Sequence, residues 1–329
     1  MMGQFSGKGW QIAIGFLALC AGTVAADWQG AQRLDLDGLG NAADARIEVA
    51  DGGFVAAAWR QNIEFSSNVQ VAVDDAGQAI AVWQQSDGNL VTVRANYWDG
   101  QAWIGPEQID ADADKAGTTP DIDLDSEGNA VAIWRLSDGS TRRIETADFD
   151  GSDWSGSVAI DPGSQRLTGP RVGLAGNGKA VATWSLDASG NRRVYGNTRH
   201  DGAWGEALLL DDGGDTNISN AELAVDRAGR AFVVWNQSDG TRTRTVARRW
   251  DGSTWLPLEL LDNGLNPTFS AQIALAGDGS GAAAWLESVN GELQVFVARL
   301  DFDPIFADRF EAASDAGPAD AGAEKPSAL

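Results

Sequence analysis

Hydrophobic and polar residues alternate with a period of two in short runs that return about every 50 residues. In "VQVAVDDAGQAIAVW" (69–83), alternating valines precede a turn at Gly77, and a second apolar run ends at Trp83. Alternation predicts a half-buried strand, and a glycine can take the positive φ of a tight turn. Each run therefore predicts an antiparallel hairpin. The equivalent runs are "DIDLDSEGNAVAIW", "RVGLAGNGKAVATW", "ELAVDRAGRAFVVW" and "QIALAGDGSGAAAW".

Three markers keep the same spacing along the chain, which is typical of a repeat architecture. Asp-Gly pairs begin at Asp99, Asp150, Asp201 and Asp251, in steps of 51, 51 and 50 residues. A tryptophan series and a glycine six residues before each member follow the same interval. The tryptophans are Trp83, Trp134, Trp184, Trp235 and Trp285, and the glycines are Gly77, Gly128, Gly178, Gly229 and Gly279. The predicted units are 69–119, 120–169, 170–220, 221–270 and 271–301.

Each unit is predicted to contain four strands. The second strand is apolar on both faces, which suits a strand between neighbouring sheets. A turn such as "SDGN" leads to a third strand, and the Asp-Gly turn leads to a fourth that begins near Trp103, Trp154, Trp204 or Trp255. Four antiparallel strands in about 50 residues, repeated, indicate an all-β fold, a β-propeller of about six blades.

These units resemble the bacterial secreted β-propellers with kelch-like or neuraminidase-like repeats, over residues 27 to about 302. The kelch Gly-Gly doublet does not recur, and no intact Asp-box (Ser-x-Asp-x-Gly-x-Thr-Trp) is present. The resemblance therefore implies the fold and no single subfamily.

The two ends of the array predict how a ring would close. Segment 27–36 resembles a fourth strand with Trp28 in the marker position, whereas the last unit has three clear strands. An N-terminal strand that completes the last blade would remove exposed edges. Unit 46–61 is truncated, because Trp59 precedes Trp83 by only 24 residues. We expect a six-position ring with one two-stranded blade; a five-bladed ring with an extra hairpin is the alternative.

Residues 1–26 are predicted to be an export signal. Lys8 precedes an apolar run, and Val24 and Ala26 occupy the small-residue cleavage positions. Lipidation at Cys20 is the alternative. No later segment is long and apolar enough to span a bilayer. Residues 302–329 are an acidic tail that we expect to be disordered, and "DPIFADRFE" within it is expected to pack on the last blade as a short strand.

The formal net charge of −23 opposes binding to nucleic acid or to anionic lipid. Because the loops between strands differ from unit to unit, the expected partner is a protein or a glycan that binds there. The loop residues considered are Asp87, Asp138 and Asp239.

Recurrent tryptophans are best explained by a need that every blade shares, namely packing against its neighbour. This interpretation covers Trp59, Trp83, Trp134, Trp184, Trp235 and Trp285, and also Trp28, Trp103, Trp154, Trp204 and Trp255. Trp98 and Trp250 occur in only two units. They are better candidates for exposed recognition residues than the recurrent tryptophans, although packing is the favoured interpretation for them too.

Two acidic loops resemble calcium-binding loops, because calcium prefers six to eight oxygen ligands. One contains Asp110, Asp112 and Asp114, and the other Asp35, Asp37 and Asp44. Both are defective: Lys115 stands where a glycine is needed, and Leu39 where a carboxylate is needed. No cofactor is therefore expected to be required, and calcium is the one metal these loops could bind.

Catalytic patterns are sparse. His200 is the only histidine, so a Ser-His-Asp system has no support, and no zinc-ligand cluster is present. The sequence favours an exported binding or scaffold module rather than an enzyme. A carbohydrate-binding lectin is the alternative, and a glycoside hydrolase or lyase is the less favoured one.

Overall fold

The computed structural model describes residues 2–3, 12–18, 42–61, 66–110, 114–164, 166–176, 178–188, 191–213, 218–219 and 221–300. All paired strands in these ranges are antiparallel. Within them, no helix is long and apolar enough to cross a membrane. The all-β class predicted from the alternating pattern is confirmed.

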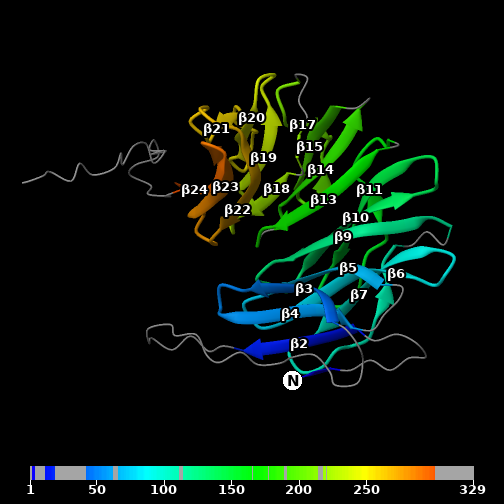
Figure 1. Cartoon of the computed structure of the whole chain (residues 1–329). Coiled ribbons are helices and arrows are strands. Elements are labelled where there is room, and N and C mark those ends of the chain that lie inside the picture. The colour runs from blue at the N-terminus through cyan, green and yellow to red at the C-terminus, as the bar shows by residue number, and fades with distance from the viewer. Residues whose placement is uncertain are drawn as a thin grey trace, which may run out of the picture.

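Six sheets follow one another in chain order along an arc (Figure 1). The first contains β1 (Met2–Gly3), β2 (Ile12–Ala18), β3 (Ala42–Val49) and β4 (Phe54–Gln61). The second contains β5 (Ser66–Val73), β6 (Ala79–Ser86), β7 (Val91–Trp98) and β8 (Glu107–Gln108), and the third contains β9 (Ala116–Leu124), β10 (Ala130–Ser137), β11 (Arg142–Phe149) and β12 (Val158–Ala159). The fourth contains β13 (Leu167–Leu174), β14 (Ala180–Ala188), β15 (Asn191–His200), β16 (Ala203–Trp204) and β17 (Leu208–Leu209). The fifth contains β18 (Glu222–Val225), β19 (Ala231–Ser238), β20 (Thr243–Trp250) and β21 (Glu259–Leu260), and the sixth β22 (Thr268–Leu275), β23 (Gly281–Val289) and β24 (Glu292–Leu300).

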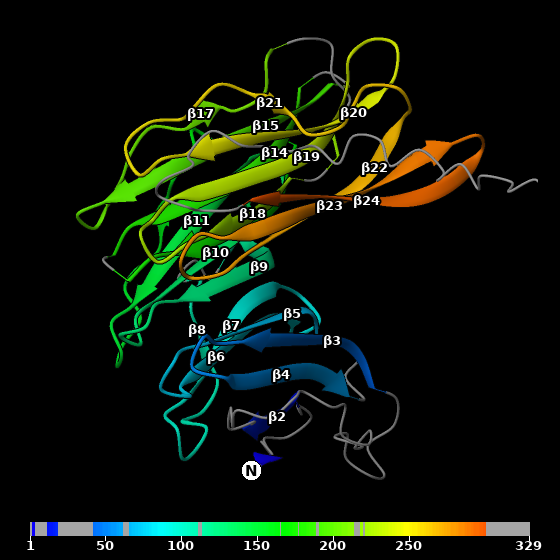
Figure 2. The same cartoon turned by 90° about the vertical axis from the view of Figure 1, so that its left-hand side faces the viewer.

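The first strands of successive sheets lie next to one another. Contacts join β3 to β5, β5 to β9, β9 to β13, β13 to β18 and β18 to β22. The second to fifth sheets then extend outward through their second, third and fourth strands, and the sixth through its second and third (Figure 2). This is the radial arrangement of propeller blades.

The hairpin between the first two strands of a sheet forms as its glycine predicts. Gly77 has a φ of 82°, and the Asp74 carboxylate accepts the Ala76 and Gln78 amides at 2.9 and 2.7 Å. First strands begin three or four residues before the predicted unit boundaries, as β5 does at Ser66, except β18, which begins at Glu222, one residue after its boundary. In β5 the strand continues past a local register shift between Ser67 and Gln70, which interrupts the alternation.

The fourth strands are shorter and begin later than predicted. In the second sheet Trp103 makes only an isolated bridge to Trp98, and β8 starts at Glu107. The Asp99 carboxylate accepts the amides of Gln101 and Ala102, both at 2.7 Å, so a tight turn precedes the strand. In the fourth sheet Asp201 and Gly202 both have positive φ, and this two-residue turn lets β16 pair at once.

The inner tryptophans are buried between neighbouring sheets. Trp134 and Trp235 are fully buried, and each joins an apolar cluster with residues of the preceding sheet. Trp134 packs with Ile80 and Val82, and Trp235 with Val194. The other members of the series, Trp59, Trp83, Trp184 and Trp285, are at most 6% exposed.

The first sheet differs from the predicted two-stranded blade. β3 and β4 form the expected hairpin, but β2 pairs along the other edge of β4, from Ile12 opposite Arg60 to Ala18 opposite Phe54. β1 and β2 belong to the segment predicted to be an export signal. Segment 27–36 and tail 302–329 lie outside the described residues, so ring closure and the role of the tail stay predictions.

Candidate functional site

Topology divides the molecule into two faces. The loop face carries the turns between second and third strands and the connections between sheets. The opposite hairpin face carries the turns between first and second strands. The loop face is the one on which the differing loops predict recognition.

Asp87, Asp138 and Asp239 are exposed on the loop face. Each carboxylate accepts two backbone amides of its own turn, as Asp138 does from Ser140 and Thr141 at 2.9 and 2.7 Å. These bonds favour the charged form and lower the pKa of all three, that of Asp138 to about 2. The three aspartates therefore hold their turns as permanently charged groups.

A pocket of about 190 Å³ opens on the loop face beside Asp138. Its lining residues come from the start of β9, the end of β10 and the start of β11. They are Lys115, Leu136, Asp138, Thr141, Arg143 and Glu145. Two cations, two carboxylates and a hydroxyl thus surround one apolar side chain. Sequence reasoning included Asp138 but did not associate Lys115 or Arg143 with it, because Lys115 precedes it by 23 residues and Arg143 lies on the next strand.

A second aspartate series was missed at the sequence level. Each sheet connection from the second sheet to the fifth contains an aspartate after a buried aliphatic residue, in steps of 51, 50 and 51 residues. The pairs are Ile109-Asp110, Ile160-Asp161, Leu210-Asp211 and Leu261-Asp262. The recurring interval and the preceding apolar residue were the available signal.

These aspartates secure the start of the third strand. Asp211 accepts the Val194 amide at 2.8 Å and Arg193 Nε at 2.9 Å. Asp262 accepts the Thr245 amide at 2.6 Å and Arg244 Nε at 2.8 Å. A buried carboxylate is stable only with such partners, so the arginine and the amide together stabilise the connection.

Asp110 lacks this arrangement. Thr92 stands where Arg193 and Arg244 stand in later sheets, and among the described residues neither carboxylate oxygen of the fully buried Asp110 has a hydrogen-bond partner. The Val93 amide and Gln108 lie near enough to favour the charged form of Asp110. Burial disfavours that form more strongly and raises the pKa of Asp110 to about 6. The side chain lies over Gly117, where an added Cβ would be 2.3 Å from Oδ2.

The predicted calcium loops are not assembled by the described residues. Asp110 is buried, Asp114 is exposed, and Asp44 pairs with Arg60 at 2.6 Å. Asp35, Asp37 and Asp112 lie outside the described residues. Within the described ranges, no group of three or more histidine, cysteine, aspartate or glutamate side chains could hold a metal ion.

Trp98 and Trp250 do not present their rings to solvent. They are 6% and 7% exposed, and their ring centroids lie 5.7 and 5.5 Å from those of Trp103 and Trp255. His200, from the preceding sheet, packs on Trp250 at 5.6 Å. Packing therefore describes both residues better than exposed recognition does, because the Asp-Gly turn folds the following tryptophan back onto the third strand. Of the outer tryptophans, Trp103 is buried, Trp154, Trp204 and Trp255 are half-buried, and Trp28 lies outside the described residues.

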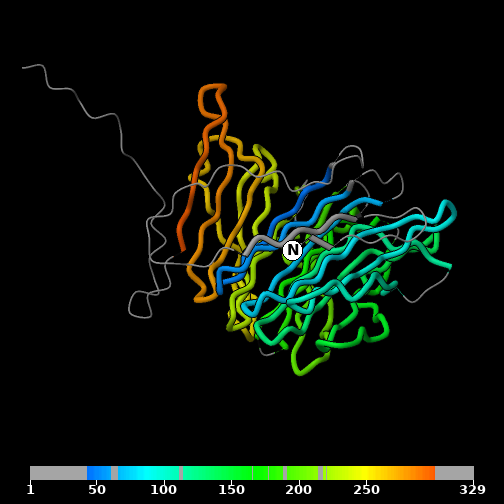
Figure 3. Tube along the Cα trace, turned by 90° about the horizontal axis from the view of Figure 1, so that it is seen from below, coloured from blue at the N-terminus to red at the C-terminus, as the bar shows by residue number. Residues whose placement is uncertain are grey.

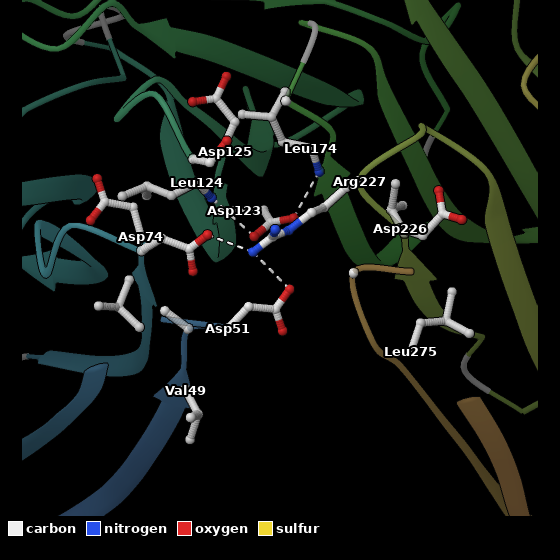
Figure 4. A pocket seen from close by; sticks show the side chains of 17 residues that line it. Val49, Asp51, Asp74, Asp123, Leu124, Asp125, Leu174, Asp226, Arg227 and Leu275 are labelled. Carbon is white, nitrogen blue, oxygen red and sulfur yellow. Dashed lines mark hydrogen bonds and ion pairs between the residues drawn. The ribbon is translucent and has the colours of Figure 1, made fainter. Parts of the chain in front are cut away.

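The axis contains a second pocket, of about 160 Å³, at the hairpin face (Figure 4). Arg227 reaches across it from the fifth sheet to Asp51 of the first, at 2.9 Å, and to Asp75 of the second, at 2.5 Å. The Arg227 amide also donates to the Gly277 carbonyl of the sixth sheet at 3.2 Å. Four sheets therefore meet at this residue, where the first sheet approaches the fifth and sixth (Figure 3).

Two carboxylates on the axis accept hydrogen bonds from the neighbouring sheet. Asp121 accepts the Val172 amide at 3.1 Å, and Asp123 accepts the Leu174 amide at 2.7 Å. Burial raises the pKa of Asp121 to about 6 and that of Asp123 to about 7, and Glu48 adds like-charge repulsion at Asp123. Because these carboxylates bind β13 amides, their arrangement is first of all structural.

The two tyrosines and the single histidine of the chain do not lie together. Tyr97 accepts a hydrogen bond from Gln78 Nε2 at 2.6 Å and packs on Phe149, whereas Tyr195 stacks on Trp184. His200 packs on Trp250. Each ring thus lies in a different interface between sheets.

No known family model matches the chain, and no curated protein matches its sequence. Solved structures with a similar fold exist. A protein of unknown function from Dyadobacter fermentans has 11% identity and a TM-score of 0.50, over 76% of this chain and 80% of that one. A polysaccharide lyase, an ulvan lyase bound to glucuronic acid and sulfated rhamnose, has 12% identity and a TM-score of 0.50, over 73% and 68%. At such identity the likeness shows the fold alone, that of a β-propeller.

Proposed function

We propose that this chain is an exported binding module that recognises an acidic glycan at the loop-face pocket beside Asp138. The lining of that pocket supports the proposal, because two cations gather there although the chain as a whole has a net charge of −23. Lys115 and Arg143 can bind carboxylate or sulfate groups, and Asp138, Glu145 and Thr141 can bind sugar hydroxyls. The ulvan lyase of similar fold binds a glycan that carries both kinds of acidic group.

The lowered pKa of Asp138 favours binding over bond cleavage at this pocket. General acid catalysis needs a carboxylic acid with a raised pKa, and hydrogen bonds from Thr141 and Ser140 lower that of Asp138 to about 2. Asp110, whose pKa is also raised, is buried, and Asp121 and Asp123 lie on the axis and hold the amides of the next sheet. A hydrolase or lyase that used Asp121 or Asp123 would have to break that support.

Glycan binding is tested by titrating residues 27–329 with an oligosaccharide of glucuronic acid and sulfated rhamnose, using calorimetry. We expect Lys115→Ala and Arg143→Ala each to weaken binding about tenfold, because a hydrogen bond to a charged group contributes about 1.5–3 kcal/mol. Arg142→Ala is the matched control, since Arg142 neighbours Arg143 without lining the pocket. A neutral oligosaccharide of equal length should not bind.

Three results would count against the proposal: unchanged affinity of both variants, equal binding of the neutral sugar, or cleavage of the oligosaccharide. If the variants bind with unchanged affinity or the neutral sugar binds equally well, a protein partner of the loop face would be sought instead. We also propose that binding is independent of calcium, so the titration with a chelator should give the same affinity.

We further propose that residues 1–26 are removed on export and that segment 27–36 completes the sixth sheet as its fourth strand, closing a ring of six sheets. Trp28, Leu34 and Asp35 reproduce the spacing of Trp103, Ile109 and Asp110. Exposed side chains on the two ends of the arc support closure: Ile47 and Val49 on β3, and Leu293, Val295 and Val297 on β24.

A further inference from the structure

The outer edge of β4 accepts a complete strand. Seven consecutive residues of β2, Ile12–Ala18, pair with residues 54–60 of β4 in antiparallel register. In the other five sheets this position belongs to a third strand that follows the second in the chain. The first sheet has no such strand of its own, because β4 is followed directly by β5 of the second sheet.

Side chains of the second sheet provide a surface for a strand in this position. Trp98 and Trp103 lie in one apolar cluster with Ala56 and Ala58 of β4. In the next interface Phe149 and Trp154 occupy the equivalent places, and Phe149 packs at 5.0 Å on Tyr97, which belongs to the third strand of the preceding sheet. The Trp98–Trp103 pair is thus placed where a third strand of the first sheet packs.

We propose that the β4 edge is a strand-addition site, which takes an extended apolar segment of a partner protein after export. The inference rests on the proposed removal of residues 1–26, which takes β2 away. Unpaired amides and carbonyls along β4 then offer main-chain hydrogen bonds to any extended segment, and adjacent pockets select its side chains.

The residues along the β4 edge indicate which kind of segment would bind there. Ala56, Ala57 and Ala58 are small, so the added strand can carry large side chains on both of its faces. One face contacts the Trp98–Trp103 pair, which favours an aromatic or branched aliphatic side chain. The segment that occupies the edge in this structure, "IAIGFLA", is uncharged and apolar throughout. The preferred partner is therefore a strand of about seven uncharged residues, antiparallel to β4.

The test uses residues 27–329 and a fluorescent peptide containing Ile12–Ala18 between pairs of lysines. We expect saturable binding, with hydrogen exchange slowed in residues 54–61 and unchanged in β24. Two further peptides carry N-methyl groups at alternate residues. One peptide is methylated at the odd-numbered positions and the other at the even-numbered positions. Since only every second amide faces the neighbouring strand, one set should weaken binding at least tenfold and the other less than twofold.

Two variants separate the proposed site from general loss of structure. Trp98→Ala should weaken peptide binding at least tenfold, whereas Trp250→Ala should not, since Trp250 is covered by His200 of its own chain. Both remove a buried ring, so their unfolding midpoints provide the matched comparison. Lys115→Ala should affect the glycan and not the peptide, which separates this inference from the proposed glycan site.

Several results would overturn the inference. They are retention of residues 1–26 in the exported chain, equal affinity of both N-methylated peptides, protection of β24 instead of β4, or exchange data showing that segment 27–36 already protects β4.

Discussion

At the scale of single residues, a repeat reveals a member that departs from its rule. Asp211 and Asp262 are paired with an arginine and a backbone amide, whereas Asp110 is buried opposite Thr92. Burial of an unpartnered carboxylate disfavours its charged form. Asp110 therefore destabilises the fold at neutral pH.

We expect Asp110→Asn to stabilise the protein above pH 6. The folded-state pKa of Asp110 is raised from 3.8 to about 6, so the folded state binds an extra proton between these values and loses stability as the pH rises through them. A shift of this size corresponds to about 3 kcal/mol. Urea unfolding at pH 4 and pH 7.5 measures the difference, which should be small at pH 4.

Asp211→Asn is the control and should destabilise, because it breaks the pair with Arg193. Thr92→Arg should stabilise the wild-type chain and not the Asp110→Asn variant, since it supplies the missing guanidinium. Equal pH profiles for wild type and Asp110→Asn would show that Asp110 has a partner in solution.

At the scale of elements, the second strand of the second to fifth sheets carries the packing. It is apolar on both faces and lies between two neighbouring sheets, and its tryptophan contacts the sheet before it. Local pattern was sufficient to predict this, because a strand buried on both faces reads as a continuous apolar run.

Trp235→Ala should lower the free energy of unfolding by about 3–5 kcal/mol, the usual cost of removing a large buried aromatic side chain. Trp235 also donates from Nε1 to Gln237 at 2.9 Å, and this bond is lost with the ring. Urea denaturation followed by far-UV circular dichroism measures the change. Leu265→Ala, at a side chain that is 71% exposed, should change stability by less than about 0.5 kcal/mol. Similar values for the two variants would refute the packing account.

At the scale of the whole molecule, the question is how the two ends of the arc are joined. Arg227 already links the fifth sheet to the first and second at the hairpin face. Exposed ion pairs contribute little to stability, so Arg227, which is 54% exposed, is not enough to close the ring. Apolar contact and a shared sheet are the stronger means of closure.

Closure by segment 27–36 predicts a specific cross-link. Ala95 pairs with Glu107 in the second sheet, and the equivalent residues are Val297 and Gln32. In residues 27–329, which contain no cysteine, Val297→Cys with Gln32→Cys should form a disulfide under mild oxidation, because directly opposed residues bring Cβ atoms close enough. Mass spectrometry of peptides identifies it. Val297→Cys with Arg309→Cys tests the tail as the rival strand, and a cross-link only there would disprove closure by segment 27–36.

The sequence alone determined the repeat, the class of strands, the hairpin glycines and the buried tryptophan series. These features depend on residues close together in the chain, so periodicity and turn chemistry are enough to predict them. Fourth-strand boundaries were less accurate, because a two-residue strand has too few positions to show alternation. The loop-face pocket, the unpaired Asp110 and the edge of β4 could be recognised only once the sheets were placed. They join side chains and strands far apart in sequence, as Arg227 and Asp75 are at a separation of 152 residues. Only the tertiary structure determines which of the many charged residues form ion pairs, because charged surface residues follow no local sequence pattern.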